Sequence, residues 1–130
     1  MKRLTAVLAL VALASGATAA LAHHSFAVFF DQDRTVTITG TVKSFAFRNP
    51  HGSIVLEVKD DAGEVSTWVV ETNSPGILRR RGWSNDSLKP GDQVTIEGWP
   101  ARDGKKYLRL RKAMRADGSV IGVPFEPTED

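Results

Sequence analysis

The segment EVSTWVVETNSPGILRRRG, residues 64–82, joins a strand pattern directly to a helix pattern. Its first part alternates valine and threonine with the residues between them, which is the period of a half-buried strand. Its second part has Ser74 in place for an N-cap, a proline at the first helical position and Gly82 as a C-terminal stop. The segment therefore predicts a strand over residues 64–72, followed by a helix of about two turns.

Strand patterns continue on both sides of this segment. Alternating apolar and polar residues, separated by turns rich in Gly, Pro and Asp, predict strands over residues 35–47, 54–59, 93–99 and 107–114. Three strands, a short helix and two strands are the order of the OB-fold, so we predict an all-β, OB-fold-like five-stranded small barrel of antiparallel strands. Another small barrel or a sandwich with the same strand count is the alternative. Gly40 inside the first strand indicates a bulge or a strong bend.

The first 22 residues have the three parts of a secretory signal peptide. Lys2 and Arg3 precede an apolar run over residues 4–13, and small residues then lead to Ala20 and Ala22. An apolar run of about ten residues is too short for a transmembrane anchor. We expect cleavage between Ala22 and His23 and a periplasmic or secreted protein, with no transmembrane segment left after cleavage.

The mature chain is expected to consist of one domain with a short tail. We place the barrel at residues 23–123 and a flexible acidic tail at residues 124–130, which contains two prolines. A pattern of Phe26, Val28 and Phe30 predicts that the barrel begins with an extended segment.

Charge and composition exclude several functions. Cleavage removes two of the 17 basic residues and none of the 15 acidic ones, so the mature chain is neutral by formal count. A general basic field for nucleic acid is therefore absent, and we expect no nucleic-acid partner. The chain has no cysteine, which excludes disulfides, a thiol nucleophile and an iron–sulfur cluster. Hydrolase and nucleotide-binding motifs are also absent, so we do not expect an enzyme.

The chain has three histidines, and cleavage would place two of them at the new terminus. A terminal His23 offers a metal ion its α-amine and its ring Nδ1, and another imidazole, from His24 or His51, would supply a third nitrogen. His24 allows a second arrangement, made of the amine, its own deprotonated amide and its own ring. Nitrogen donors suit copper, and Cu(II) has the highest affinity among the divalent ions of its row. The alternative is that all three histidines are merely solvated.

The path of the N-terminal segment decides whether these histidines meet. A tight hairpin through residues 31–34 would leave His24 opposite about residue 41, short of His51. Strong curvature at Gly40, another path of the segment or a site shared by two chains would bring them together. Glu71 is a possible additional oxygen ligand.

A second possible binding surface lies around the fifth strand. Its residues are Trp99, Tyr107, Arg109 and Arg111. Aromatic and basic residues together are typical of OB-fold binding grooves. This surface predicts, as the alternative function, a non-metal binding module for an oligosaccharide, a peptide or an anionic envelope component. The simpler interpretation is a solvated outer strand face, in which lysine and arginine protect the edge.

Several short motifs together resemble those of a known family. They are HHSF at residues 23–26, NPH at 49–51, Trp68 followed by Glu71, residues 78–83, and LKPGD at 88–92. The chain is similar in these motifs to small exported bacterial proteins that form a family of unknown function. The resemblance covers nearly all of the mature chain and implies a periplasmic, OB-like single domain, without implying an activity. From the histidines we predict binding, delivery or sequestration of copper, with a periplasmic protein as a possible partner.

Overall fold

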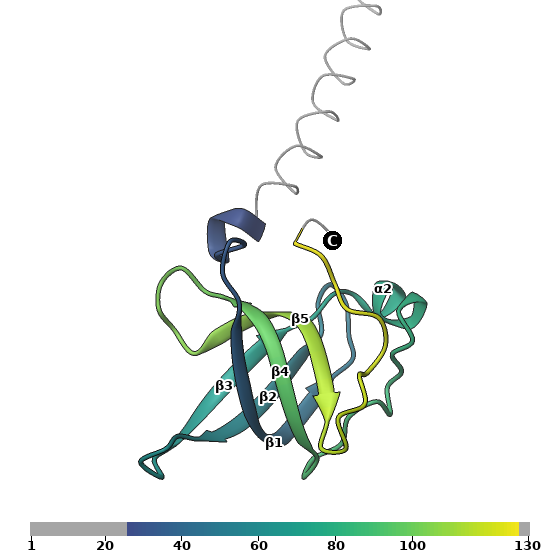
Figure 1. The fold of residues 1–130 in the computed structure, drawn as a ribbon. Coiled ribbons are helices and arrows are strands. Elements are labelled where there is room, and N and C mark those ends of the chain that lie inside the picture. The colour runs from purple at the N-terminus through teal and green to yellow at the C-terminus, as the bar shows by residue number, and fades with distance from the viewer. Residues whose placement is uncertain (1–25, 128–130) are drawn as a thin grey trace, which may run out of the picture.

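Five strands close into a barrel in the computed structural model, which describes residues 26–127 (Figure 1). The order around the barrel is β1-β2-β3-β5-β4. The elements are β1 (Val36–Ala46), β2 (Ser53–Lys59), β3 (Val65–Glu71), α2 (Pro75–Arg80), β4 (Gln93–Pro100) and β5 (Tyr107–Arg115). The predicted all-β, OB-fold-like barrel, with one short helix between the third and fourth strands, is confirmed. The predicted signal peptide, His23 and His24 lie outside the described residues.

One strand pair is parallel, which the sequence analysis did not predict. β3 and β5 run parallel, with Val69 opposite Tyr107 and Glu71 opposite Arg109, while the other four neighbouring pairs are antiparallel. The reason is geometric, because strand directions cannot alternate all the way round a closed ring of five strands. The expectation of antiparallel strands throughout is therefore wrong for this pair.

The first strand changes partner halfway along its length. Residues 36–41 pair with β4, and residues 41–46 pair with β2. Gly40 lies at this change, and a Cβ atom added there would lie only 2.5 Å from the backbone oxygen of Glu57. Gly40 thus permits a close approach of two strands, whereas the register shift itself falls between Val42 and Ser44.

The short helix begins and ends as its sequence predicts. The hydroxyl of Ser74 accepts a hydrogen bond from the backbone N–H of Ile77, and the proline stands at the first helical position. Gly82 has φ of 86°, a left-handed conformation that ends the helix, and Trp83 N–H donates to the carbonyl of Leu78 at 3.0 Å. Leu78 is fully buried, so the helix is held on the barrel by this side chain.

Residues 26–29 form a helical turn instead of the expected extended segment. Phe26 and Phe30 are four residues apart, so one helical turn places both rings on the same side. Their ring centroids lie 5.5 Å apart, and Phe26 also packs edge-on against Trp99. Phe30 then pairs with Ala101, so the segment crosses one end of the barrel instead of running beside β1.

The packed domain extends further toward the C-terminus than expected. Phe125 is 1% exposed, its N–H donates to the carbonyl of Arg111, and its ring lies 5.3 Å from the guanidinium of Arg81. The expected start of a flexible tail after Val123 is therefore too early, because an aromatic side chain beyond it fills the core. Within residues 26–127, no helix has the length and apolar character needed to cross a membrane.

Candidate functional site

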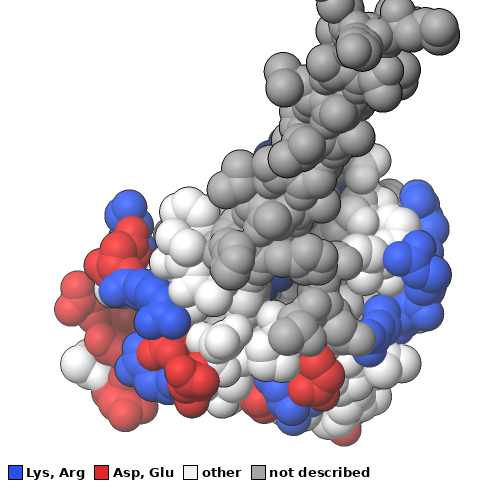
Figure 2. Space-filling model, turned by 90° about the horizontal axis from the view of Figure 1, so that it is seen from above, with Lys and Arg blue, Asp and Glu red and all other residues white. Residues whose placement is uncertain are grey.

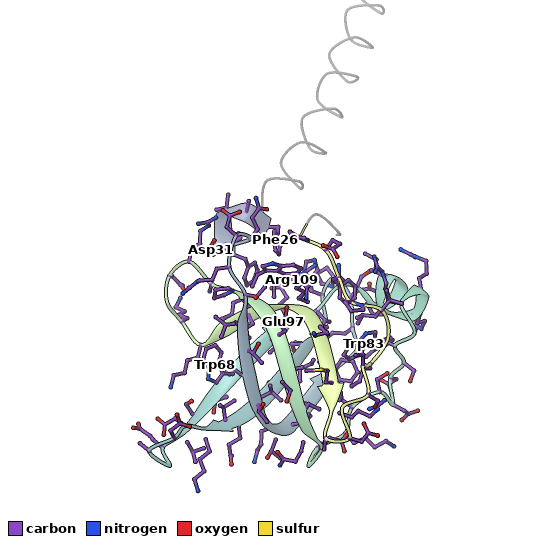
Figure 3. All side chains as sticks on the ribbon, in the orientation of Figure 1. Phe26, Asp31, Trp68, Trp83, Glu97 and Arg109 are labelled. Carbon is purple, nitrogen blue, oxygen red and sulfur yellow. The ribbon has the colours of Figure 1, made fainter. Side chains whose placement is uncertain are left out.

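A pocket of about 930 Å³ opens at the end of the barrel that residues 26–30 cross. Its walls are largely apolar and include Phe26, Phe30 and Tyr107. Phe30 stacks on Tyr107 with 5.5 Å between the ring centroids. His51, Glu71 and Arg109 also line the pocket, and Figure 3 shows Arg109 directly below the helical turn that carries Phe26. A largely apolar pocket with a few convergent polar groups is the usual form of a ligand site.

The parallel strand pair brings two opposite charges together in this pocket. Glu71 ends β3 and lies directly opposite Arg109 of β5. The Nη1 atom of Arg109 donates to Oε1 of Glu71 at 2.7 Å and to the carbonyl of Thr72 at 3.2 Å. The phenol of Tyr107 donates to the other carboxylate oxygen, Oε2. Arg109 is only 2% exposed, so its charge is compensated inside the protein.

These contacts set the protonation states of the two acidic groups. Burial raises the pKa of Glu71, but hydrogen bonds from Tyr107 and His51 and the positive charge of Arg109 outweigh it, so the pKa lies below its ordinary value. Burial and the hydrogen bond to Glu71 together raise the pKa of the Tyr107 phenol well above its ordinary value. At neutral pH the pocket therefore holds a carboxylate and a neutral phenol.

His51 contacts both members of this ion pair through one ring nitrogen. Its Nδ1 atom lies 2.8 Å from Oε1 of Glu71 and 3.0 Å from Nη1 of Arg109. With the proton on Nδ1 the ring donates to Glu71, and with the proton on Nε2 it accepts from Arg109. Among residues 26–127, only Nδ1 of this ring makes a hydrogen bond, and the side chain is 45% exposed.

The described part of the predicted metal site consists of His51 with Glu71 beside it. His23 and His24 fall outside residues 26–127. Within that range no three His, Asp or Glu side chains form a group that could hold a metal ion. A site at His51 thus needs donors from another part of the chain or from another molecule.

The four residues of the alternative surface do not form one exposed face. Trp99 is 3% exposed and Arg109 is 2% exposed, so both belong to the interior. Tyr107 is half-buried in the pocket, and Arg111 forms a 2.6 Å ion pair with Glu97. The interpretation of Arg109 as part of a solvated outer face is wrong, because its guanidinium is buried against Glu71, the carbonyl of Thr72 and His51.

Sequence reasoning missed the ion pair and the aromatic wall of the pocket. Glu71 and Arg109 carry opposite charges, and they lie on the third and fifth strands, which are neighbours in a closed OB-like barrel. The predicted fold was therefore a signal from which their pairing could have been predicted. The spacing of Phe26 and Phe30 fits both a strand and a helix, and this ambiguity concealed the aromatic wall.

The fold and the pocket define a small OB-fold-like barrel protein with a largely apolar pocket at one end. The chain belongs to a family of unknown function (DUF6152), which matches residues 10–109. No curated protein matches the chain.

Two solved structures resemble the barrel. Rim1, a mitochondrial single-stranded DNA-binding protein from S. cerevisiae, is 11% identical with a TM-score of 0.49, covering 69% of this chain and 95% of that one. A chain from a complex of TiaS with a transfer RNA and ATP is 18% identical with a TM-score of 0.42, covering 66% of this chain and 19% of that one.

Proposed function

We propose that the protein is exported and binds copper at a site that begins with His23. After cleavage behind Ala22, the α-amine and ring Nδ1 of His23 supply two nitrogens, and Nε2 of His51 supplies the third. His24 replaces His51 in the second arrangement of donors. The observation that supports the first arrangement is that Phe26 and His51 line the same pocket. The protein binds, delivers or sequesters copper in this proposal, with a metal-exchanging periplasmic protein as its partner.

The path of residues 26–30 across the barrel end supports this site. A hairpin beside β1 would have kept the terminus away from His51, but Phe30 pairs with Ala101 instead. His24 and His23 are two and three residues before Phe26, so their Cα atoms lie within about 7 and 11 Å of its Cα. That Phe26 and His51 line one pocket supports the proposed meeting of these histidines with His51.

Glu71 has a supporting role in the proposed site. A histidine that ligates a metal usually donates its other ring N–H to a carboxylate or a carbonyl. A metal ion at Nε2 of His51 selects the tautomer in which Nδ1–H donates to Glu71, at the observed 2.8 Å. Both carboxylate oxygens of Glu71 already accept from Tyr107 and Arg109, so we assign it to orienting His51 and not to binding the metal directly.

The test compares three proteins by Cu(II) competition titration at neutral pH. They are the chain that begins at His23, the same chain with one alanine added before His23, and the His51→Ala variant of the first. The added alanine preserves every side chain but moves the amine out of the chelate, so we expect a marked loss of affinity. His51→Ala tests the third nitrogen separately. Equal affinity of the cleaved and extended proteins would rule out the amine-anchored site.

Two further measurements complete the test. N-terminal sequencing of the exported protein shows whether His23 is the first residue. The amine has an ordinary pKa of about 8 and imidazole one of about 6.5, and both must be deprotonated to bind. Copper affinity should therefore fall steeply from about pH 8 to about pH 5, with release of protons on binding.

A further inference from the structure

We propose that the barrel end formed by residues 26–30 and 101–106 docks onto an anionic lipid bilayer. Val28 and Phe29 are 62% and 64% exposed, although they are large and apolar. They are consecutive residues of the segment 26–30, in which Phe26 and Phe30 pack against the protein. The segment therefore presents two exposed apolar side chains, which also line the pocket, in addition to the two rings that it buries.

Basic side chains are fixed beside this apolar pair. The loop of residues 101–106 carries three basic residues and one acidic residue. Arg102 is tied to the helical turn twice, since its backbone N–H donates to the carbonyl of Phe29 at 2.9 Å and its Nε to the carbonyl of Ala27 at 2.8 Å. Lys105 pairs with Asp103 at 2.9 Å, whereas Arg102 and Lys106 form no ion pair within residues 26–127. Figure 1 shows the loop and the turn side by side at one end of the barrel.

The same end carries further basic residues. α2 has Arg79 and Arg80 in its last turn and no acidic residue in its first turn. Figure 2 looks onto this end and shows a group of Lys and Arg side chains, with no Asp or Glu among them, at the edge where α2 lies, while basic and acidic side chains are mixed at the opposite edge. A second basic group thus lies across this end from the loop of residues 101–106.

Exposed apolar residues flanked by cations are the arrangement that holds proteins at an anionic membrane surface. The apolar side chains enter the boundary between headgroups and acyl chains, and Lys and Arg are attracted by the lipid charge. Val65 is also apolar and exposed, but it does not fit an anionic membrane surface. It follows a hairpin that contains Asp60, Asp61 and Glu64, and an anionic surface repels these charges.

The test measures co-sedimentation of the chain that begins at His23, which contains every described residue, with lipid vesicles. One set of vesicles mixes phosphatidylcholine with phosphatidylglycerol, and the other contains phosphatidylcholine alone. EDTA is present throughout, so the result is independent of the proposed copper site. We expect binding to the anionic vesicles only, weakened by added salt.

Two variants and two matched controls locate the contact. Phe29→Ser should lower the partition coefficient about tenfold, through the loss of one buried aromatic side chain. Lys106→Gln should lower it about fivefold at low salt. Val65→Ser and Lys59→Gln, at the opposite hairpin, should leave it unchanged, and thermal unfolding should show that all four variants are folded.

Two outcomes would overturn the proposal. One is equal partition of the parent protein and Phe29→Ser. The other is concentration-dependent dimerisation that Phe29→Ser abolishes, since the apolar pair would then be a contact between two copies of the chain. Neither outcome affects the copper proposal, because the titration that tests it uses no lipid.

Discussion

Glu71 and Arg109 face each other across the parallel pair of β3 and β5, with 2.7 Å between Oε1 and Nη1. Arg109 is almost wholly buried, while the side chain of Glu71 is 23% exposed toward the pocket. The same carboxylate oxygen, Oε1, accepts from the buried guanidinium and contacts Nδ1 of His51. The Glu71–Arg109 ion pair is thus part of both the packing of the barrel and the candidate site.

Removing the buried guanidinium should destabilise the fold. Arg109→Gln leaves Glu71 without its ionic partner, and breaking a largely buried pair of this kind costs about 2–4 kcal/mol of unfolding free energy. Arg111→Gln is the matched control, because the more exposed pair of Arg111 with Glu97 contributes at most about 1 kcal/mol. Urea unfolding of both variants measures the difference, and equal losses would contradict the structural role of Arg109.

The carboxylate of Glu71 should support copper binding without being a ligand. Glu71→Gln removes the charged acceptor for Nδ1–H of His51, and changes of this kind lower metal affinity about 10–100-fold. Glu97→Gln is the control, since Glu97 is also a carboxylate paired with an arginine but does not line the pocket. Cu(II) competition titration on both folded variants measures the effect. An unchanged affinity in Glu71→Gln would show that His51 binds without this support, or that it does not bind.

The stability of the metal-free protein should depend on the ionisation of Glu71. Its pKa in the folded protein lies below the ordinary value of 4.5, so the ionised form stabilises the fold above that value. This stability is lost as the pH falls through the lowered pKa. Unfolding free energies measured from about pH 7 down to about pH 3 should therefore decrease less in Glu71→Gln than in the parent protein. Identical pH profiles would contradict a lowered pKa.

Phe125 should contribute to stability although it lies close to the C-terminus. Its ring is 1% exposed, and truncation of a buried phenylalanine costs about 3–5 kcal/mol. Val123→Ala is the control, because Val123 is 54% exposed and its loss should change stability by at most about 0.5 kcal/mol. A negligible effect of Phe125→Ala on thermal unfolding would instead support the expectation of a flexible tail after Val123.

Two glycine substitutions should have opposite effects. A Cβ atom at position 40 would lie 2.5 Å from the oxygen of Glu57, so Gly40→Ala should destabilise the barrel by about 1–3 kcal/mol. A Cβ atom at position 76, inside α2, has its nearest neighbour at 3.8 Å, so Gly76→Ala should stabilise by up to about 1 kcal/mol. Chemical denaturation distinguishes the two, and a stabilising Gly40→Ala would contradict the close approach of β1 and β2.

The sequence by itself determined the order of the elements and the ends of the helix. Alternation of apolar and polar residues places each strand, and Ser74 and Gly82 bound α2, because these are properties of a few neighbouring residues. The placement of two histidines behind the predicted cleavage site is also a sequence observation, since cleavage behind Ala22 is predicted from a local pattern alone.

Only the tertiary structure decided which side chains meet at the barrel end. Arg109 is separated from Glu71 by 38 residues, and their contact depends on the pairing of β5 with β3, which alternation along β5 does not reveal. The conformation of the segment that carries Phe26 and Phe30 was likewise not determined by the sequence, because their spacing fits a strand and a helical turn equally well. The helical turn is selected by contacts with Trp99 and Tyr107, residues whose positions depend on the closed barrel.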